Sequence, residues 1–130
     1  MHKPLLKIAI LLAALAVILG AFGAHALKSM FETSELQTFD TGVRYQMYHS
    51  FAIIIAAILY KEFSSKLVIL AGKLFFVGIV LFSVSLYALT FVKYIGATSF
   101  LWIGAITPLG GIFFVLAWSI LFIGIYKNKV

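Results

Sequence analysis

Residues 42–60 read GVRYQMYHSFAIIIAAILY, a polar opening followed by a continuous apolar run. A helix needs about 20 mostly apolar residues to cross a bilayer, and this stretch comes close to that length. Arg44, Gln46 and His49 stand in the polar opening, although lipid hydrocarbon does not solvate such groups. These side chains are therefore either anchors at the membrane surface or the lining of a site just beneath it.

The composition of the whole chain supports a membrane location. Of its 130 residues, 64% are hydrophobic and 11% are charged, and the mean hydropathy is +1.15. Soluble domains average about 45–50% apolar and about 25% charged residues. The sequence thus predicts an integral membrane protein. Residues 1–130 are predicted to form a single transmembrane domain, with the lipid bilayer as its main partner.

Two further features of the composition exclude classes of protein. The chain has no cysteine, which excludes disulfides and thiolate chemistry. Its net charge is +6, but the basic residues stand singly between apolar runs and form no basic patch with interleaved aromatic residues. We therefore expect no nucleic-acid binding, and we interpret the basic residues as flanking charges that set the membrane topology.

Four segments are long and apolar enough to cross a membrane, at about residues 5–27, 43–60, 74–92 and 100–126. Backbone polar groups in lipid must find their partners within the segment, so all four are predicted to be helices. The predicted fold class is all-α, an integral membrane four-helix bundle.

The first segment has a rival interpretation as a cleavable signal peptide. It has a basic start, and Ala24-His25-Ala26 matches a small-x-small cleavage site. However, the apolar run from Ile8 to Ala24 is longer than the usual hydrophobic region of a signal peptide. Its removal would also leave three helices and an exposed polar opening. We therefore expect the first segment to remain as a membrane-spanning helix.

The basic residues also predict an orientation. With four spans, both termini and the second connection lie on the same side of the membrane. Seven basic residues stand on that side and three on the other. The first set is Lys3, Lys7, Lys61, Lys66, Lys73, Lys127 and Lys129, and the second set is Lys28, Arg44 and Lys93. This excess predicts that both termini are cytoplasmic.

Several local features can be predicted as well. The first connection is predicted to enter the second span as a helix, with Ser34 or Thr33 as its cap. Gly42 would let that helix bend at the membrane surface. Pro108 lies inside the fourth predicted span, where proline is typical of a kink.

Small residues form stripes along two of the predicted helices, where they would allow backbones to approach closely. The first span carries Ala9, Ala13, Ala16, Gly20 and Ala24 at spacings of three and four residues. The fourth span carries Gly110, Ala117 and Gly124 at spacings of seven residues. These stripes predict either packing within the bundle or contact with another membrane protein, including a second copy of this chain.

Polar side chains from all four predicted helices gather in one half of the bundle, whereas the other half is almost wholly apolar. If both termini are cytoplasmic, this polar half faces outward. The candidate site residues are His25, Arg44, Gln46, Tyr48, His49, Ser83, Ser85, Tyr87 and Thr107. Ionisable groups inside membrane spans are candidates for function by default, so this cluster is the predicted site.

Arg44 and His49 differ in what their positions imply. His49 lies roughly 7–8 Å deeper along a helix than Arg44, at about 1.5 Å per residue. The long side chain of Arg44 can reach the lipid headgroups or pair with Asp40, but the short imidazole of His49 cannot reach as far. His49 is therefore expected to face the bundle and to find a protein partner there. The candidate partners are Tyr45, Tyr87 and Ser85.

The cluster lacks the groups on which catalysis usually depends. No nucleophile with an adjacent base and no paired carboxylates are visible within the predicted spans. Two histidines without a fixed third ligand do not predict a zinc site. We therefore expect no enzymatic activity, no metal and no cofactor.

Three stretches resemble the motifs of a known family: LGAFGAHAL at residues 19–27, TGVRYQMYHSFAI at residues 41–53 and GAITPLGG at residues 104–111. They are similar to those of the YwdK/YgdD-like family of small membrane proteins. FSVSLYAL at residues 82–89 looks like the family's FSGSLY motif, with Val84 where glycine is common. The resemblance implies a four-span protein of the bacterial inner membrane with its first span retained. It implies no particular activity, substrate or catalytic residue.

Two functions are compatible with this sequence. The first is a structural or accessory membrane protein, in which the outward-facing polar cluster holds the bundle together or docks a membrane-protein partner. The alternative is a binding or transport protein, in which the cluster receives a small molecule, an anion or a lipid headgroup. The apolar half disfavours a standing pore through one bundle, so transport would require an oligomer or a large movement.

Overall fold

The computed structural model describes residues 1–127, and this part of the chain is helical apart from short connections. Its α-helices are α1 (Lys3–His25), α2 (Thr33–Phe63), α3 (Lys66–Ile79), α4 (Ser85–Tyr94) and α5 (Ile106–Lys127). The π-helical turn Val80–Val84 joins α3 and α4 into one continuous rod. The 3-10 helix Thr98–Ala105 leads into α5. Residues 1–127 contain no β-strand, which confirms the predicted all-α class.

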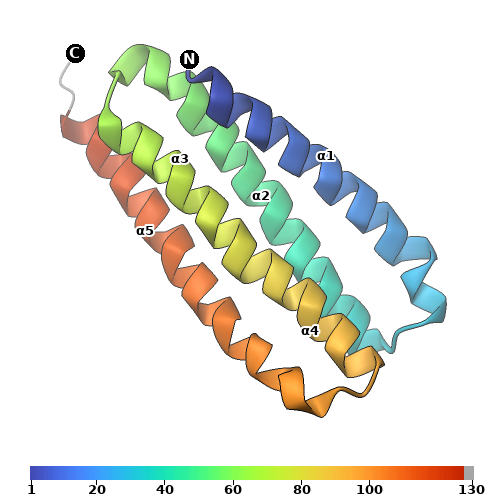
Figure 1. The fold of residues 1–130 in the computed structure, drawn as a ribbon. Helices are drawn as coiled ribbons and strands as arrows, with labels where there is room; N and C mark the ends of the chain where they lie inside the picture. The colour runs from blue at the N-terminus through green and yellow to red at the C-terminus, as the bar shows by residue number, and fades with distance from the viewer. Residues whose placement is uncertain (128–130) are drawn as a thin grey trace.

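The helices form four antiparallel rods that lie side by side (Figure 1). α1 packs along α2, α2 packs along the α3–α4 rod, and this rod packs along α5. The start of α1, the α2–α3 connection and the end of α5 lie at one end, which we call the terminal end. The α1–α2 and α4–α5 connections lie at the other, which we call the far end.

Three of the rods could cross a membrane. The segments Lys3–Ser29, Lys66–Tyr94 and Thr98–Lys127 are long and apolar enough to do so. α2 is also long, with 31 residues, but Arg44, Gln46 and His49 make its first half more polar. The structure therefore shows a helical membrane bundle in which a less apolar helix, α2, packs between α1 and the α3–α4 rod.

α2 begins well before the second predicted span, because the first connection is helical from Thr33 onward. A capping box starts the helix. Glu35 Oε2 accepts a hydrogen bond from the Glu32 N–H at 2.7 Å, and the Glu32 side chain accepts one from the Glu35 N–H. The prediction that Ser34 or Thr33 caps this helix is therefore wrong, because the two glutamates satisfy these N–H groups reciprocally.

Gly42 makes room for a neighbouring side chain, and Pro108 lies near the start of α5, just after the change from 3-10 helix to α-helix. α2 runs unbroken through Gly42, where a Cβ atom would lie 2.7 Å from Cε1 of Tyr87. Gly42 therefore makes room for Tyr87 rather than bending the helix. Pro108 lies in the first turn of α5, where backbone N–H groups have no partner within the helix. The proline thus removes no hydrogen bond from a helix interior.

The main hydrophobic core lies toward the terminal end and draws on α1, α2, α3 and α5. Its buried residues are Leu5, Ala9, Ala52, Ile53, Ala56, Ala57, Val68, Ala71, Phe75, Ile79, Phe114, Ala117 and Leu121. A smaller core toward the far end contains Ala16, Leu27, Phe31, Phe39 and Val43. The half of the bundle that was predicted to be apolar is therefore the half that holds the main core.

The small residues of α5 face the α3–α4 rod. Gly110 lies against the backbone of Phe82, Gly124 lies against Val68, and Ala117 is fully buried. The absence of larger side chains at these positions allows the two rods to approach closely. This stripe therefore packs within the bundle, which is one of the two uses predicted for it.

The close approach of α5 to Phe82 can be tested by adding one methyl group. A Cβ atom at Gly110 would overlap the Phe82 backbone, which cannot move aside as a flexible side chain can. We expect Gly110→Ala to lower the free energy of unfolding by about 1–3 kcal/mol, the usual penalty of overpacking. The matched control is Gly111→Ala, because a Cβ atom there meets nothing within 4 Å. Unfolding in detergent, followed by circular dichroism, measures both, and equal stability would contradict the close approach.

Candidate functional site

Gln46 is the centre of a buried polar network. Its side chain is 2% exposed. Its Nε2 donates a hydrogen bond to the backbone carbonyl of Leu12 in α1 at 2.9 Å, and its Oε1 accepts one from the Tyr87 hydroxyl in α4 at 2.8 Å. One amide side chain on α2 thereby bonds to both neighbouring rods.

The position of the Leu12 carbonyl shows how deep this network lies. Leu12 is nine residues from Lys3 and thirteen from His25, the two ends of α1. These spacings correspond to about 14 Å and about 20 Å along the helix. The Gln46 side chain therefore reaches the middle of α1. It lies deeper in the bundle than its place in the polar opening of residues 42–60 suggests.

Neighbouring residues hold Tyr87 and Gln46 in place. The Tyr87 ring lies against Gly42 and packs on the Phe39 ring, with 4.9 Å between ring centroids. The Ser50 hydroxyl, which is fully buried, donates to the backbone carbonyl of Gln46 at 2.7 Å. Tyr87 can reach Gln46 because Gly42 presents no side chain in its way.

A second polar pair joins α4 to α5. The hydroxyl groups of Ser85 and Thr107 lie 2.7 Å apart. Ser85 donates to the carbonyl of Phe82 at 2.8 Å, so the proton between the two hydroxyls comes from Thr107. The Phe82 carbonyl belongs to the π-helical turn, where the regular α-helical bonding pattern is interrupted. This pair therefore ties α5 to the irregular part of the neighbouring rod.

Ser83 also belongs to the π-helical turn. It is fully buried, and its hydroxyl has no hydrogen-bond partner among residues 1–127. Its backbone carbonyl lies close to α2, because a Cβ atom on Gly42 would be 3.2 Å from that oxygen. Ser83 thus marks the close approach of α2 to the π-helical turn, without joining either hydrogen-bonded pair.

His49 is buried among aromatic side chains. It is 7% exposed, and its ring stacks on Phe114 with 3.4 Å between centroids and 3° between planes. Its Nδ1 lies 2.8 Å from the Tyr45 carbonyl, and this oxygen can only accept, so Nδ1 carries a proton. Tyr45 is thus the partner among the three candidates, through its backbone, whereas Tyr87 and Ser85 bond elsewhere. The ring borders a groove of about 670 Å³ that Phe82, Phe114 and Trp118 also line.

The remaining predicted residues lie at the surface. Arg44 Nε pairs with Asp40 Oδ2 at 3.0 Å, with the two side chains 57% and 59% exposed. His25 Nδ1 lies 3.0 Å from the Ala21 carbonyl, within its own helix, and Tyr48 is 57% exposed. The structure therefore joins four of the nine predicted residues in two pairs, Gln46–Tyr87 and Ser85–Thr107.

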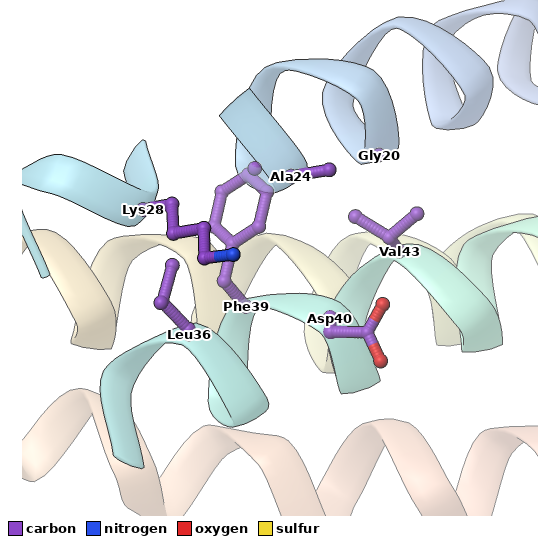
Figure 2. Close-up of a pocket in the computed structure, with 8 residues that line it drawn as sticks. Gly20, Ala24, Lys28, Leu36, Phe39, Asp40 and Val43 are labelled. Carbon is purple, nitrogen blue, oxygen red and sulfur yellow. The ribbon is translucent and has the colours of Figure 1, made fainter. Parts of the chain in front are cut away.

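A groove of about 340 Å³ lies between α1 and α2 toward the far end. Gly20 and Gly23 form part of one wall, and Phe39 forms part of the other. Figure 2 shows the Lys28 side chain extending past Phe39 toward the side on which Asp40 lies. The groove thus presents charges of both signs beside an apolar floor.

Several residues that shape this region carry little or no signal in the sequence. Leu12 contributes through its backbone carbonyl, which has no signature in the sequence. Phe114 resembles the other phenylalanines of the chain, so its stacking on His49 could not be read from its identity. Lys28 lines the far-end groove. Its position just after the small-residue stripe of the first helix was only a weak indication of this. Among residues 1–127, no three His, Cys, Asp or Glu side chains gather as metal ligands.

Residues 19–111 match the profile of a family described as "Protein of unknown function (DUF423)". The chain belongs to the DUF423 family. The matched range contains all nine predicted site residues and the three quoted motif stretches. The range begins and ends with these motifs, at Leu19 and Gly111.

Bacterial relatives support the same assignment. UPF0382 membrane protein YwdK of Bacillus subtilis is 44% identical over 116 residues, which cover 88% of this chain and 89% of the relative. A UPF0382 membrane protein of Haemophilus influenzae is 39% identical over 113 residues, covering 87% and 86%. UPF0382 membrane protein SH2409 of Staphylococcus haemolyticus is 37% identical over 126 residues, covering 94% and 98%. These matches confirm the YwdK-like resemblance and the membrane location. No solved structure matches this chain significantly.

The burial of His49 can be tested against that of its neighbour. His49→Ala removes a ring that stacks on Phe114, and we expect it to lower the free energy of unfolding by about 2–4 kcal/mol, as other large-to-small core substitutions do. Tyr48→Ala is the control, because this adjacent side chain is 57% exposed and should change stability far less. Chemical unfolding in detergent measures both variants. A Tyr48→Ala effect as large as that of His49→Ala would contradict the structural role of the His49 ring.

Proposed function

We propose that this protein is a structural or accessory protein of the bacterial inner membrane, with four membrane spans and no catalytic activity. The observation that supports it most is the bonding of Gln46, whose two polar atoms both have partners on neighbouring rods. A side chain used in this way holds helices together and presents no polar atom to a ligand. An accessory role would bring the bundle into contact with another membrane protein or with a second copy.

α2 is the proposed fourth span. It lies between α1 and the α3–α4 rod, and both of these are apolar enough to cross a membrane (Figure 1). Its 31 residues extend about 46 Å, more than the roughly 30 Å of a hydrocarbon core. Over residues 51–60 its exposed side chains are apolar, namely Phe51, Ile55 and Ile58. In its more polar half, Gln46 and His49 are buried against other helices, which favours a span rather than a surface helix.

The proposed orientation places the terminal end in the cytoplasm, with the whole chain forming one transmembrane domain. Lys3, Lys7, Lys61, Lys66, Lys73 and Lys127 lie in helices that begin or end there. Lys129, the seventh lysine of the predicted set, lies outside the described residues. Because basic residues are enriched in cytoplasmic segments, this excess supports cytoplasmic termini.

Reporter fusions test the four spans and the orientation. We expect green fluorescent protein fused after Val130 to fluoresce, because it would stay in the cytoplasm. Alkaline phosphatase fused after Gly96, between α4 and α5, should be active, because it would be exported. A phosphatase fusion after Ser64, between α2 and α3, is the control and should be inactive. Phosphatase activity at Ser64, or absence of fluorescence from the Val130 fusion, would contradict the proposed topology.

The alternative, a binding or transport protein that uses the polar cluster, has less support. Gln46 and Tyr87 bond to each other, Ser85 bonds to Thr107, and His49 stacks on an aromatic ring. The far-end groove contains none of the cluster residues, but Lys28 and Asp40 are charges that a lipid headgroup or an anion could meet there. A catalytic role has less support still, since Asp40 already pairs with Arg44 at the surface.

A double-mutant cycle tests the structural role of the Gln46–Tyr87 pair. Tyr87→Phe leaves Gln46 Oε1 without its partner, and Gln46→Leu removes both hydrogen bonds of the amide. We expect each variant to be less stable than the wild type, with a coupling free energy of about 0.6–1.7 kcal/mol, the range for hydrogen bonds between membrane helices. Unfolding of the two single variants and the double variant in detergent gives this value.

Tyr48→Phe is the matched control for this cycle, because the Tyr48 side chain is largely exposed and its hydroxyl joins no helices. Strictly additive effects of Tyr87→Phe and Gln46→Leu would contradict the structural proposal. A ligand screen addresses the alternative in parallel. If an anion or a lipid headgroup raised the melting temperature of the wild type but not of Lys28→Gln, binding at the far-end groove would replace the structural role as the better proposal.

A further inference from the structure

A separate groove of about 260 Å³ lies toward the terminal end, between the start of α1 and the second half of α3. His2, Leu5 and Ile8 line one side, Lys73 and Phe76 line the other, and Ile53 of α2 forms part of the floor. Leu5 approaches α3 closely, because a Cβ atom on Gly72 would lie 2.8 Å from Leu5 Cδ1. The Leu5 side chain therefore closes the groove between α1 and α3, and the groove is separate from the polar network around Gln46.

The groove is almost wholly apolar, and two basic side chains, Lys73 and His2, contribute to its rim. Lys73 and His2 lie nearest the terminal end, and Lys73 is exposed. Phe76 and Val77 lie three and four residues further along α3, about 4.5 Å and about 6 Å deeper into the bundle. Ile8 is partly exposed on the facing helix. A basic rim above an apolar channel matches the arrangement of a phospholipid, whose charged headgroup lies above its acyl chains.

His2 is held firmly at the mouth of the groove. Its backbone N–H donates to the Ala57 carbonyl of α2 at 2.8 Å, and its ring packs edge-on against Tyr60 with 5.7 Å between centroids. Its Nδ1 accepts from the Leu5 N–H at 3.3 Å, as the N-cap of α1. Because Nδ1 is an acceptor, the ring proton is on Nε2, and this N–H is the ring donor left for an anionic ligand.

Lys73 does not stand alone on its face of α3. Lys66 is seven residues earlier, close to two helical turns, so the two lysines lie on the same side of the helix. Both border a shallow groove of about 350 Å³ with Ile69 and Leu70. The face of α3 beside the mouth thus carries two positive charges, about 10 Å apart along the axis.

The charge of the terminal end suits an anionic partner. Its basic residues in the described part of the chain are Lys3, Lys7, Lys61, Lys66, Lys73 and Lys127, and its acidic residue there is Glu62. In the orientation proposed above, this end meets the cytoplasmic leaflet, where anionic lipids concentrate. Basic pockets between membrane helices on that side bind anionic headgroups.

We propose that this groove binds an anionic phospholipid, with the phosphate held by Lys73 and His2 and one acyl chain lying along Leu5, Ile8 and Phe76. Charge selects the headgroup, and the apolar channel fixes where the lipid sits. The binding chemistry depends on the groove itself and not on the hydrogen bonds of Gln46. It is therefore independent of the proposed structural role.

The test uses the full chain, purified in a neutral maltoside detergent, freed of lipid and titrated with dioleoyl phosphatidylglycerol or dioleoyl phosphatidylcholine. Native mass spectrometry measures the lipid bound at each concentration. We expect tighter binding of phosphatidylglycerol than of phosphatidylcholine. Lys73→Gln should weaken phosphatidylglycerol binding about fivefold, the factor expected for one lysine at an anionic surface. It should weaken phosphatidylcholine binding less, because the choline ammonium offsets the charge of the phosphate that this lipid also carries.

Two further variants separate the groove from general charge attraction. Lys127→Gln removes an exposed lysine from the same end but from α5, away from the groove, and should retain the wild-type affinity for phosphatidylglycerol. Ile8→Trp fills the apolar channel without changing any charge, and should weaken the binding of both lipids. Circular dichroism confirms that each variant is folded, and Lys73→Gln alters an exposed side chain, so it serves even if Ile8→Trp does not fold.

Three results would overturn the proposal. The first is equal binding of the two lipids by the wild type. The second is a loss in Lys127→Gln as large as that in Lys73→Gln, which would indicate general charge attraction. The third is a lipid-independent dimer that Ile8→Trp abolishes, which would show that a second copy occupies the groove. None of these results would alter the coupling between Gln46 and Tyr87, so the two proposals fail separately.

Discussion

A buried amide in a membrane bundle must find its hydrogen-bond partners within the protein, because hydrocarbon offers none. Gln46 meets this constraint by bonding to the Leu12 carbonyl and the Tyr87 hydroxyl. A shift of α1 by a single residue, about 1.5 Å along its axis, would move the carbonyl away from the amide. The amide therefore sets the level of three rods relative to one another.

The π-helical turn Val80–Val84 lies close to the level at which the α3–α4 rod bonds to both α2 and α5. Tyr87 reaches α2 over Gly42, while Ser85 bonds to Thr107 on α5. The turn interrupts the regular helical bonding, and the Phe82 carbonyl accepts from Ser85 instead. Gly110 of α5 approaches the backbone on the other side of this turn. Both α2 and α5 thus approach the backbone of this turn closely, at Gly42 and at Gly110.

The two halves of the bundle treat polar groups in opposite ways. Toward the far end, amide and hydroxyl side chains are buried and bond across helices, so they contribute to cohesion. Toward the terminal end, the interior is apolar, and the polar groups are lysines at the surface above an apolar groove. The buried amide and hydroxyl groups have partners within the bundle, whereas the surface lysines are accessible to molecules outside it. Recognition of an outside molecule therefore belongs more naturally to the terminal end.

The all-α membrane class follows from the sequence alone, because lipid demands long apolar helices and the composition leaves few other solutions. The sequence also identified the packing face of α5, since Gly110, Ala117 and Gly124 repeat with the helical period. It selected Gln46 and Tyr87 by their polarity, but not as partners, because 41 residues separate them. Periodicity along one helix shows which side chains share a face. The tertiary structure alone shows which helix lies opposite and at what level. Every residue has a backbone carbonyl, so nothing in the sequence distinguishes the Leu12 carbonyl as the acceptor for Gln46.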